Sequence, residues 1–121
     1  MGEASVVSVE RLPRAVVFHV LAAELRKDEV EAICGAVDAE QPAAALPFIL
    51  ELSKVAFMGS LAMGVLIGLN KEFVNRGQRL IFASLQPNVL QSISMSRINK
   101  LMEIAPNLDA AMNDAKRDNQ K

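Results

Sequence analysis

Short apolar runs alternate along the chain with segments in which apolar residues recur every three or four positions. This pattern predicts strands and helices in turn. Two strands, Ser5–Glu10 and Ala15–Leu21, flank a proline-containing turn and are expected to pair antiparallel. Further strands are predicted at Phe48–Leu52 and Arg79–Leu85, and a short last one at Glu103–Ala105.

Four helices are predicted between and after these strands, and boundary signals support them. Asp28 followed by Glu31 matches a capping box, Ser60 occupies an N-cap position, and Gly77 occupies the left-handed position after a helix. The predicted helices are Asp28–Ala39, Leu61–Arg76, Pro87–Ser94 and Asn107–Lys116, with a further helical or turn segment at Met95–Met102.

The order of elements predicts the fold class. After the first hairpin, strands alternate with helices, which favours a mostly parallel sheet with helical crossovers. A chain of 121 residues without an internal repeat or low-complexity linker is expected to form one α/β domain. We assign residues 1–116 to this domain and 117–121 to a polar, disordered tail.

The amino-acid composition argues against some classes of function. Hydrophobic residues make up 51% of the chain, with five Phe and no Trp or Tyr, so a mostly aliphatic core is expected. The 13 basic and 14 acidic residues supply no basic field for a phosphate backbone, which argues against nucleic acid as a partner. The longest apolar stretch, Val55–Leu69, is shorter than the ~20 residues of a membrane-spanning helix.

One cysteine and one histidine limit the chemistry further. Cys34 cannot form an internal disulfide and fits a reducing compartment, so a cytoplasmic location is expected. It lies on the apolar stripe of the first helix and is expected in the core. His19 has no metal-ligand or triad partner nearby in sequence. We therefore expect no metal, no cofactor and no enzymatic activity.

The segment from Leu50 to Leu66, LELSKVAFMGSLAMGVL, precedes a helix ending in Asn75-Arg76-Gly77. It resembles the STAS family of anti-sigma factor antagonists, in which a strand delivers D-hydrophobic-S-x-V-x-F-M-D-S-S-G-L onto the start of a helix. Segments Leu21–Leu25, Ser84–Val89 and Met95–Leu101 are similar to the family's L-x-G-E-L-D, S-P-x-V and M-S-G-L-x-K segments. The resemblance covers nearly the whole chain and implies a SpoIIAA-like fold.

Several positions depart from the family pattern. Ser60 falls on the family's phosphoacceptor position, but Gly59 replaces the acidic residue before it. Leu61 replaces the second serine, Ala62 replaces the following glycine, and Arg26 replaces the acidic residue that ends the upstream motif. These changes concern the phosphorylation switch rather than the fold.

Two of these positions have alternative interpretations. Ser60 is either phosphorylated by a partner kinase or only caps the helix. Gly59 either permits a sharp turn with positive φ or records the loss of a carboxylate that the switch used.

The resemblance implies that the turn around Ser60 and the helix after it form a partner surface. Met58 and Met63 either fill the core or serve recognition. Arg26 and Lys27, on the loop after the second strand, either are solvated charges or select an acidic partner. Gly64 and Gly68 are expected to allow close packing of the helix on the sheet. The candidate partner-binding residues are Arg26, Lys27, Met58, Gly59, Ser60, Leu61, Met63 and Gly64.

Three functions follow as hypotheses. The first is a bacterial partner-switching regulator that binds an anti-sigma factor or related serine kinase, as a monomer or weak dimer. The second is a constitutive adaptor or scaffold subunit in a stress-sensing or lipid-transport complex, without the switch. The third is a small-ligand or nucleotide-binding module, for which the helix N-terminus at Ser60 is the sole phosphate-binding feature.

Overall fold

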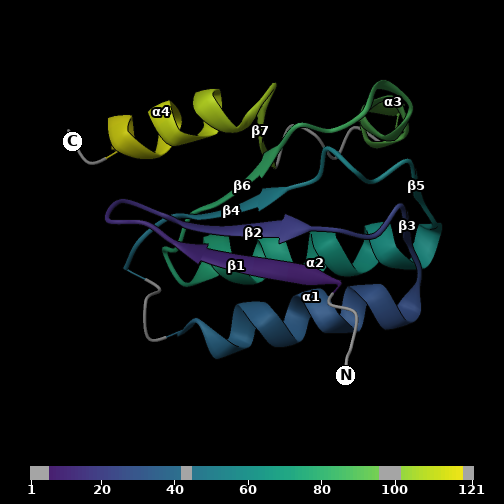
Figure 1. Ribbon diagram of the computed structural model, residues 1–121, viewed down its shortest axis with the longest axis horizontal. Helices are drawn as coiled ribbons and strands as arrows, with labels where there is room; N and C mark the ends of the chain where they lie inside the picture. The colour runs from purple at the N-terminus through teal and green to yellow at the C-terminus, as the bar shows by residue number, and fades with distance from the viewer. Residues whose placement is uncertain (1–5, 42–44, 96–101, 119–121) are drawn as a thin grey trace.

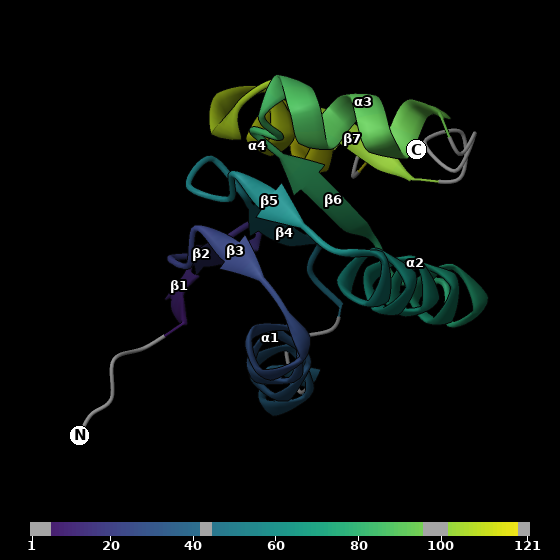
Figure 2. The same cartoon turned by 90° about the vertical axis from the view of Figure 1, so that its right-hand side faces the viewer.

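The computed structural model describes residues 6–41, 45–95 and 102–118 (Figure 1). A central five-stranded sheet lies between helices 27–39 and 60–75 on one face and helix 108–118 on the other (Figures 1 and 2). The elements are, in chain order, β1 (Val7–Arg11), β2 (Val16–Val20), β3 (Glu24–Leu25), α1 (Lys27–Ala39), β4 (Phe48–Glu51), β5 (Phe57–Met58), α2 (Ser60–Asn75), β6 (Leu80–Ala83), α3 (Pro87–Met95), β7 (Glu103–Ala105) and α4 (Leu108–Asp118).

The main sheet has the strand order β1-β2-β4-β6-β7. Strands β1 and β2 form an antiparallel hairpin, and every other neighbouring pair is parallel. Phe48 of β4 lies opposite Val16 of β2 on one side and Leu80 of β6 on the other. The predicted α/β class, the N-terminal hairpin and the mostly parallel sheet are therefore confirmed.

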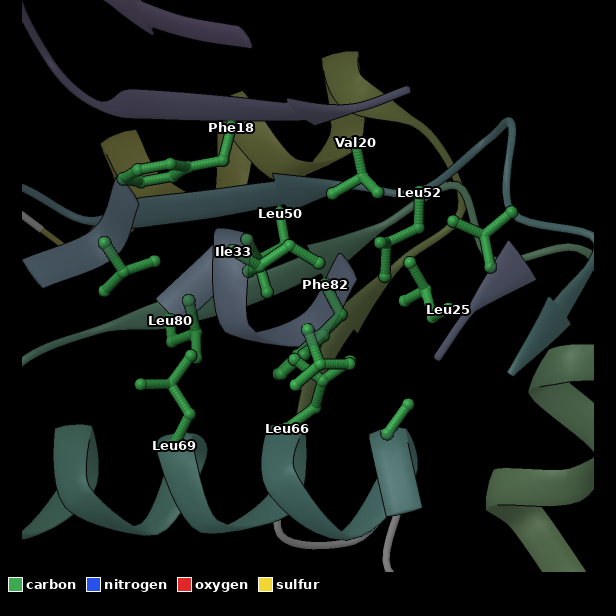
Figure 3. Close-up of a cluster of buried hydrophobic side chains, with 14 of the residues drawn as sticks. Phe18, Val20, Leu25, Ile33, Leu50, Leu52, Leu66, Leu69, Leu80 and Phe82 are labelled. Carbon is green, nitrogen blue, oxygen red and sulfur yellow. The ribbon is translucent and has the colours of Figure 1, made fainter. Parts of the chain in front are cut away.

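The core consists of two clusters, one on each face of the sheet. Phe18, Leu50 and Phe82 project from adjacent strands toward α1 and α2 (Figure 3). Their neighbours, such as Ile49 and Ile81, face the opposite side and pack with α4. Alternate side chains of a strand point to opposite faces, so strands covered on both faces have continuous apolar runs.

Helix α2 ends in the way that the sequence predicts. Gly77 has φ 72°, and its N–H donates to the carbonyl of Val74. The N–H of Gln78 donates to the carbonyl of Phe73 at 2.8 Å. These two bonds define a Schellman motif, which favours glycine because of the left-handed backbone.

Helix α1 begins one residue earlier than predicted, and its cap is different. Arg26 is the N-cap residue, and its backbone N–H donates to the Glu29 carboxylate at 2.9 Å. The expected capping box of Asp28 and Glu31 is therefore wrong. With the helix starting at Lys27, Glu29 occupies the third helical position, from which a carboxylate reaches back to the cap.

Two short strands were missed by the sequence analysis. Strands β3 and β5 have two residues each and form a separate parallel pair, with Leu25 opposite Met58. Two residues are too few to show an alternating pattern, so no sequence period signals them. Most of the expected segment Met95–Met102 and the tail beyond Asp118 lie outside the described residues, whereas α4 continues two residues past the predicted end at Lys116.

Candidate functional site

The β3–β5 pair brings together two segments that are distant in sequence. Backbone N–H groups of Ala56 and Phe57 donate to the carbonyl of Ala23 at 2.7 and 3.1 Å. The N–H of Gly59 donates to the carbonyl of Leu25 at 3.5 Å. The start of α1 and the start of α2 consequently lie at the same end of the domain (Figure 2).

Gly59 rather than Ser60 is the N-cap residue of α2. Ser60 is the first helical residue, so the expectation that its side chain caps the helix is wrong. Gly59 has φ −74° and ψ 168°, which is extended backbone open to any residue. The alternative in which Gly59 permits a sharp turn with positive φ is therefore wrong. A Cβ there would lie 3.8 Å from Cε2 of Phe57, an ordinary contact, so the backbone does not require glycine.

Ser60 is exposed at the positive end of the helix dipole. Among the described residues no side chain caps the first turn of α2, and that turn carries no acidic residue. Backbone N–H groups at such a helix start lack partners within the helix and favour a negative charge nearby.

Two large apolar side chains are exposed on either side of Ser60. Phe57 is 54% exposed and Leu61 is 60% exposed. Burying such side chains against a partner releases about 1.5–3 kcal/mol for each one fully covered. Leu61 was among the candidate residues, but Phe57 was missed. Strand β5 turns Phe57 to the face opposite Met58, but a strand of two residues leaves no pattern in the sequence that would have indicated this.

The remaining candidates on α2 and β5 differ in exposure. Met58 is only 8% exposed and packs in the core, Met63 is half-buried against the same core, and Gly64 is exposed. A Cβ at Gly64 or Gly68 would meet no heavy atom within 4 Å. The expected close packing of these glycines on the sheet is therefore wrong, because both lie away from the neighbouring backbone.

Arg26 and Lys27 are exposed beside this end of the domain. Arg26 forms an ion pair with Glu24, with Nη2 2.7 Å from Oε1. Their side chains are 73% and 52% exposed, and ion pairs this open contribute little to stability. The Arg26 guanidinium can therefore exchange Glu24 for an acidic group on a partner at small cost.

Other chemistry-bearing residues are accounted for locally. Nε2 of His19 lies 2.8 Å from the Glu10 carboxylate, across the β1–β2 hairpin. Within residues 6–41, 45–95 and 102–118, no group of three His, Cys, Asp or Glu side chains is arranged to hold a metal ion. In the same ranges, no helix has the length and apolar character needed to cross a membrane.

Comparison with known proteins identifies the family. Residues 5–111 match the STAS domain. An anti-sigma-factor antagonist (STAS) domain protein from Planctomyces limnophilus superposes with a TM-score of 0.79 at 20% identity, covering 91% of this chain and 97% of that one. The Bacillus cell fate determinant SpoIIAA in its phosphorylated form gives 0.66 at 22%, covering 88% and 96%. The murine solute carrier 26 A9 anion transporter gives 0.73 at 14%, covering 89% of this chain but 18% of the transporter. These structures share the fold, and the match over residues 5–111 shows that the chain belongs to the STAS domain family.

Proposed function

We propose that this STAS domain is a regulatory protein-binding module that exchanges between partners through one surface. We call this the Ser60 surface. The observation that carries the proposal is an exposed serine at a helix start, between the exposed side chains of Phe57 and Leu61. The Ser60 surface comprises Arg26, Lys27, Phe57, Gly59, Ser60, Leu61, Met63 and Gly64, with Met58 supporting it from the core.

Phosphorylation of Ser60 would change this surface in a defined way. It adds about −1.5 to −2 charges and three strong acceptor oxygens. The helix dipole and free N–H groups at the start of α2 accommodate that charge in the unbound domain. A partner that covers Phe57 and Leu61 must desolvate the same phosphate, which is costly. The modified domain therefore releases a partner that binds the neutral serine.

The partner class that fits is an anti-sigma factor or a related serine kinase, in a bacterial cytoplasm. SpoIIAA, which has the same fold, exists in a phosphorylated form, and Ser60 falls on the position that resembles the family's phosphoacceptor; together these support phosphorylation of Ser60. Arg26 favours a partner that presents a carboxylate, since its present ion pair with Glu24 is exposed and easily replaced. The domain would act as a monomer or weak dimer and would release a sigma factor or another output from the partner.

A second candidate is a constitutive adaptor subunit that has lost the switch. Gly59 and Arg26 favour it, because an adaptor needs neither of the family's acidic residues. The occurrence of the fold as 18% of a transporter chain shows that a STAS fold also serves as one part of a larger protein.

Capture of the tagged protein from its native cells, with mass spectrometry of partners and of the Ser60 peptide, separates the two. The switch predicts a small ATP-binding serine kinase and partial phosphorylation of Ser60. The adaptor predicts a stable complex of fixed stoichiometry with Ser60 always unmodified.

The recovered partner then allows a quantitative test. We expect Ser60→Asp to weaken partner binding more than tenfold, about 1.4 kcal/mol. Ser8→Asp, at an exposed position on edge strand β1, is the matched control and should leave the dissociation constant unchanged. An unchanged constant for Ser60→Asp would remove Ser60 from the mechanism.

A further inference from the structure

A groove of about 430 Å³ lies between α1 and α2, on the helical face of the sheet. The two helices run side by side there (Figure 2). The floor of the groove is apolar and comes from both helices, whereas charged side chains stand at its edges. The lining residues are Lys27, Val30, Glu31, Cys34, Gly35, Asp38, Leu61 and Val65.

The lining residues on α1 form one stripe along the helix. They begin at Lys27 and end at Asp38, with two adjacent pairs, Val30–Glu31 and Cys34–Gly35, one helical turn apart between them. Eleven helical steps of 1.5 Å give the groove a length of roughly 16 Å. Leu61 and Val65 are one turn apart on α2 and form the opposite wall. A helix of about three turns matches this length, and packing between two helices suits a third one.

The charge around the groove is mainly negative. The pKa of the Cys34 thiol is raised, first by burial and then by the carboxylates of Asp38, Glu72 and Glu31. Three carboxylates therefore lie close enough to the Cys34 thiol, at the centre of the groove, to raise its pKa. Glu72 also forms an exposed ion pair with Arg76, whose Nη2 lies 3.7 Å from Oε1 of Glu72. Lys27 is the one basic residue among those that line the groove.

We propose that the α1–α2 groove binds an amphipathic helix of the partner protein whose apolar side chains are flanked by Lys or Arg. The apolar face would cover Cys34 and Val65, and the basic residues would face Glu31 and Asp38. Lys27 and Leu61 belong to both the groove and the Ser60 surface, so one partner can span the two sites. The inference extends the proposed function, and it rests on that function for the identity of the partner but not for the chemistry of the groove.

Gly35 provides a way to block the groove without disturbing the fold. A Cβ at this position would meet no heavy atom within 4 Å. A glutamine there extends into the groove and also favours the helix, since Gly is a poor helix former. Val74 on α2 is 63% exposed, lies on the opposite side of the helix from Leu61 and Val65, and does not line the groove, so Val74→Gln is the control.

The probe is a 14-residue synthetic helix of Leu and Lys, with Leu at positions three and four apart. A Leu/Glu peptide of the same pattern is its control. Because Cys34 is the only cysteine of the chain, its alkylation rate reports occupancy of the groove directly. We expect the Leu/Lys peptide to slow alkylation at least fivefold at saturation and the Leu/Glu peptide to leave the rate unchanged.

Fluorescence anisotropy then gives affinities for the variants. Gly35→Gln and the double variant Glu31→Lys/Asp38→Lys should each weaken Leu/Lys peptide binding at least tenfold. Val74→Gln and Asp109→Lys, the latter on α4 across the sheet, should bind the Leu/Lys peptide within twofold of the original protein.

Three results would overturn the inference. The first is equal protection of Cys34 from alkylation by the Leu/Lys and Leu/Glu peptides, and the second is a loss of peptide affinity in the control variants equal to that in the groove variants. The third is protection of Cys34 when the concentration of the domain alone is raised, because a second copy of the chain would then be the occupant. None of these measurements involves Ser60, so their failure leaves the partner assay with Ser60→Asp standing. Loss of the Ser60 hypothesis likewise leaves the groove test valid.

Discussion

Replacing Gly59 by Asp restores an acidic residue at the position where the family carries one, and its effect on stability follows from the start of α2. Gly59 is the N-cap residue, with extended backbone that aspartate adopts readily. Its Cβ would make only an ordinary contact with Phe57. The new carboxylate can accept from the N–H of Leu61 or Ala62, the second and third helical residues.

The expected gain in the free energy of unfolding for Gly59→Asp has two parts. Exchanging Gly for Asp at an N-cap is worth a few tenths of a kcal/mol. A carboxylate within the first turn, where α2 has no acidic residue, adds about 0.3–1 kcal/mol through the helix dipole. We therefore expect Gly59→Asp to raise the free energy of unfolding by about 1 kcal/mol, equivalent to roughly 3–6 °C in Tm for a domain of this size.

The assay is urea unfolding at pH 7 and at pH 3, with Gly59→Ala and Gly59→Asn as controls. Alanine caps poorly and should cost about 0.5 kcal/mol, whereas asparagine supplies the cap without the charge. Hydrogen bonding lowers the folded pKa of the new carboxyl below its unfolded value of about 3.9. Its stabilisation is thus fully present above that value and is lost as the pH falls through the folded pKa.

A destabilising Gly59→Asp, or a gain that Gly59→Ala reproduces, would refute the reasoning. Either result would mean that residue 59 does not cap α2 with extended backbone. A gain in Gly59→Asn equal to that of Gly59→Asp at pH 7 would assign the effect to the hydrogen bond and remove the dipole contribution.

Two further predictions concern the core and the end of α1. Phe73→Ala should lower the free energy of unfolding by about 3–5 kcal/mol, since Phe73 is 1% exposed and the centre of its ring lies 5.5 Å from that of Phe48. Val74→Ala, at a 63% exposed position, is the control and should change the free energy of unfolding by less than about 0.5 kcal/mol. Equal urea midpoints for the two variants would contradict the packing. The Glu40 carboxylate accepts from Nε and Nη2 of Arg11 at 2.7 and 2.5 Å, and these bonds hold its pKa below the usual 4.5. Glu40→Gln should therefore be less stable than the original protein at pH 7, and the difference in stability should disappear as the pH falls through the folded pKa of Glu40. A difference that does not depend on pH would contradict a stabilising ion pair between Arg11 and Glu40.

The position of Ser60 shows where local sequence signals are ambiguous. A serine before an apolar helical stripe is a good N-cap, and so is the glycine next to it, so the pattern alone placed the helix start one residue late. The β3–β5 pairing resolves the ambiguity. It holds Gly59 against Leu25 and leaves Ser60 as the first helical residue, exposed to solvent.

The cap of α1 and the glycines of α2 make the same point at longer range. The position of Arg26 beside β3 starts α1 one residue early and makes Glu29 the capping acid. Gly64 and Gly68 have a spacing typical of close packing, yet a Cβ at either position would meet no heavy atom within 4 Å. Which face of a helix is covered depends on neighbouring elements that a local pattern does not contain.

The sequence by itself determined the class and order of the elements, because the apolar periods of the long strands and helices are local and strong, and Gly77 ends α2 as its conformational freedom predicts. It also marked Ser60, Leu61, Arg26 and Lys27 as candidates. Tertiary structure alone decided that the short strands β3 and β5 pair and so bring the starts of α1 and α2 together. It also decided that Phe57 is exposed while Met58 is buried, and that a groove with acidic edges opens between α1 and α2. These features arise from contacts between segments distant in the chain, and such contacts leave no periodic signal in either segment.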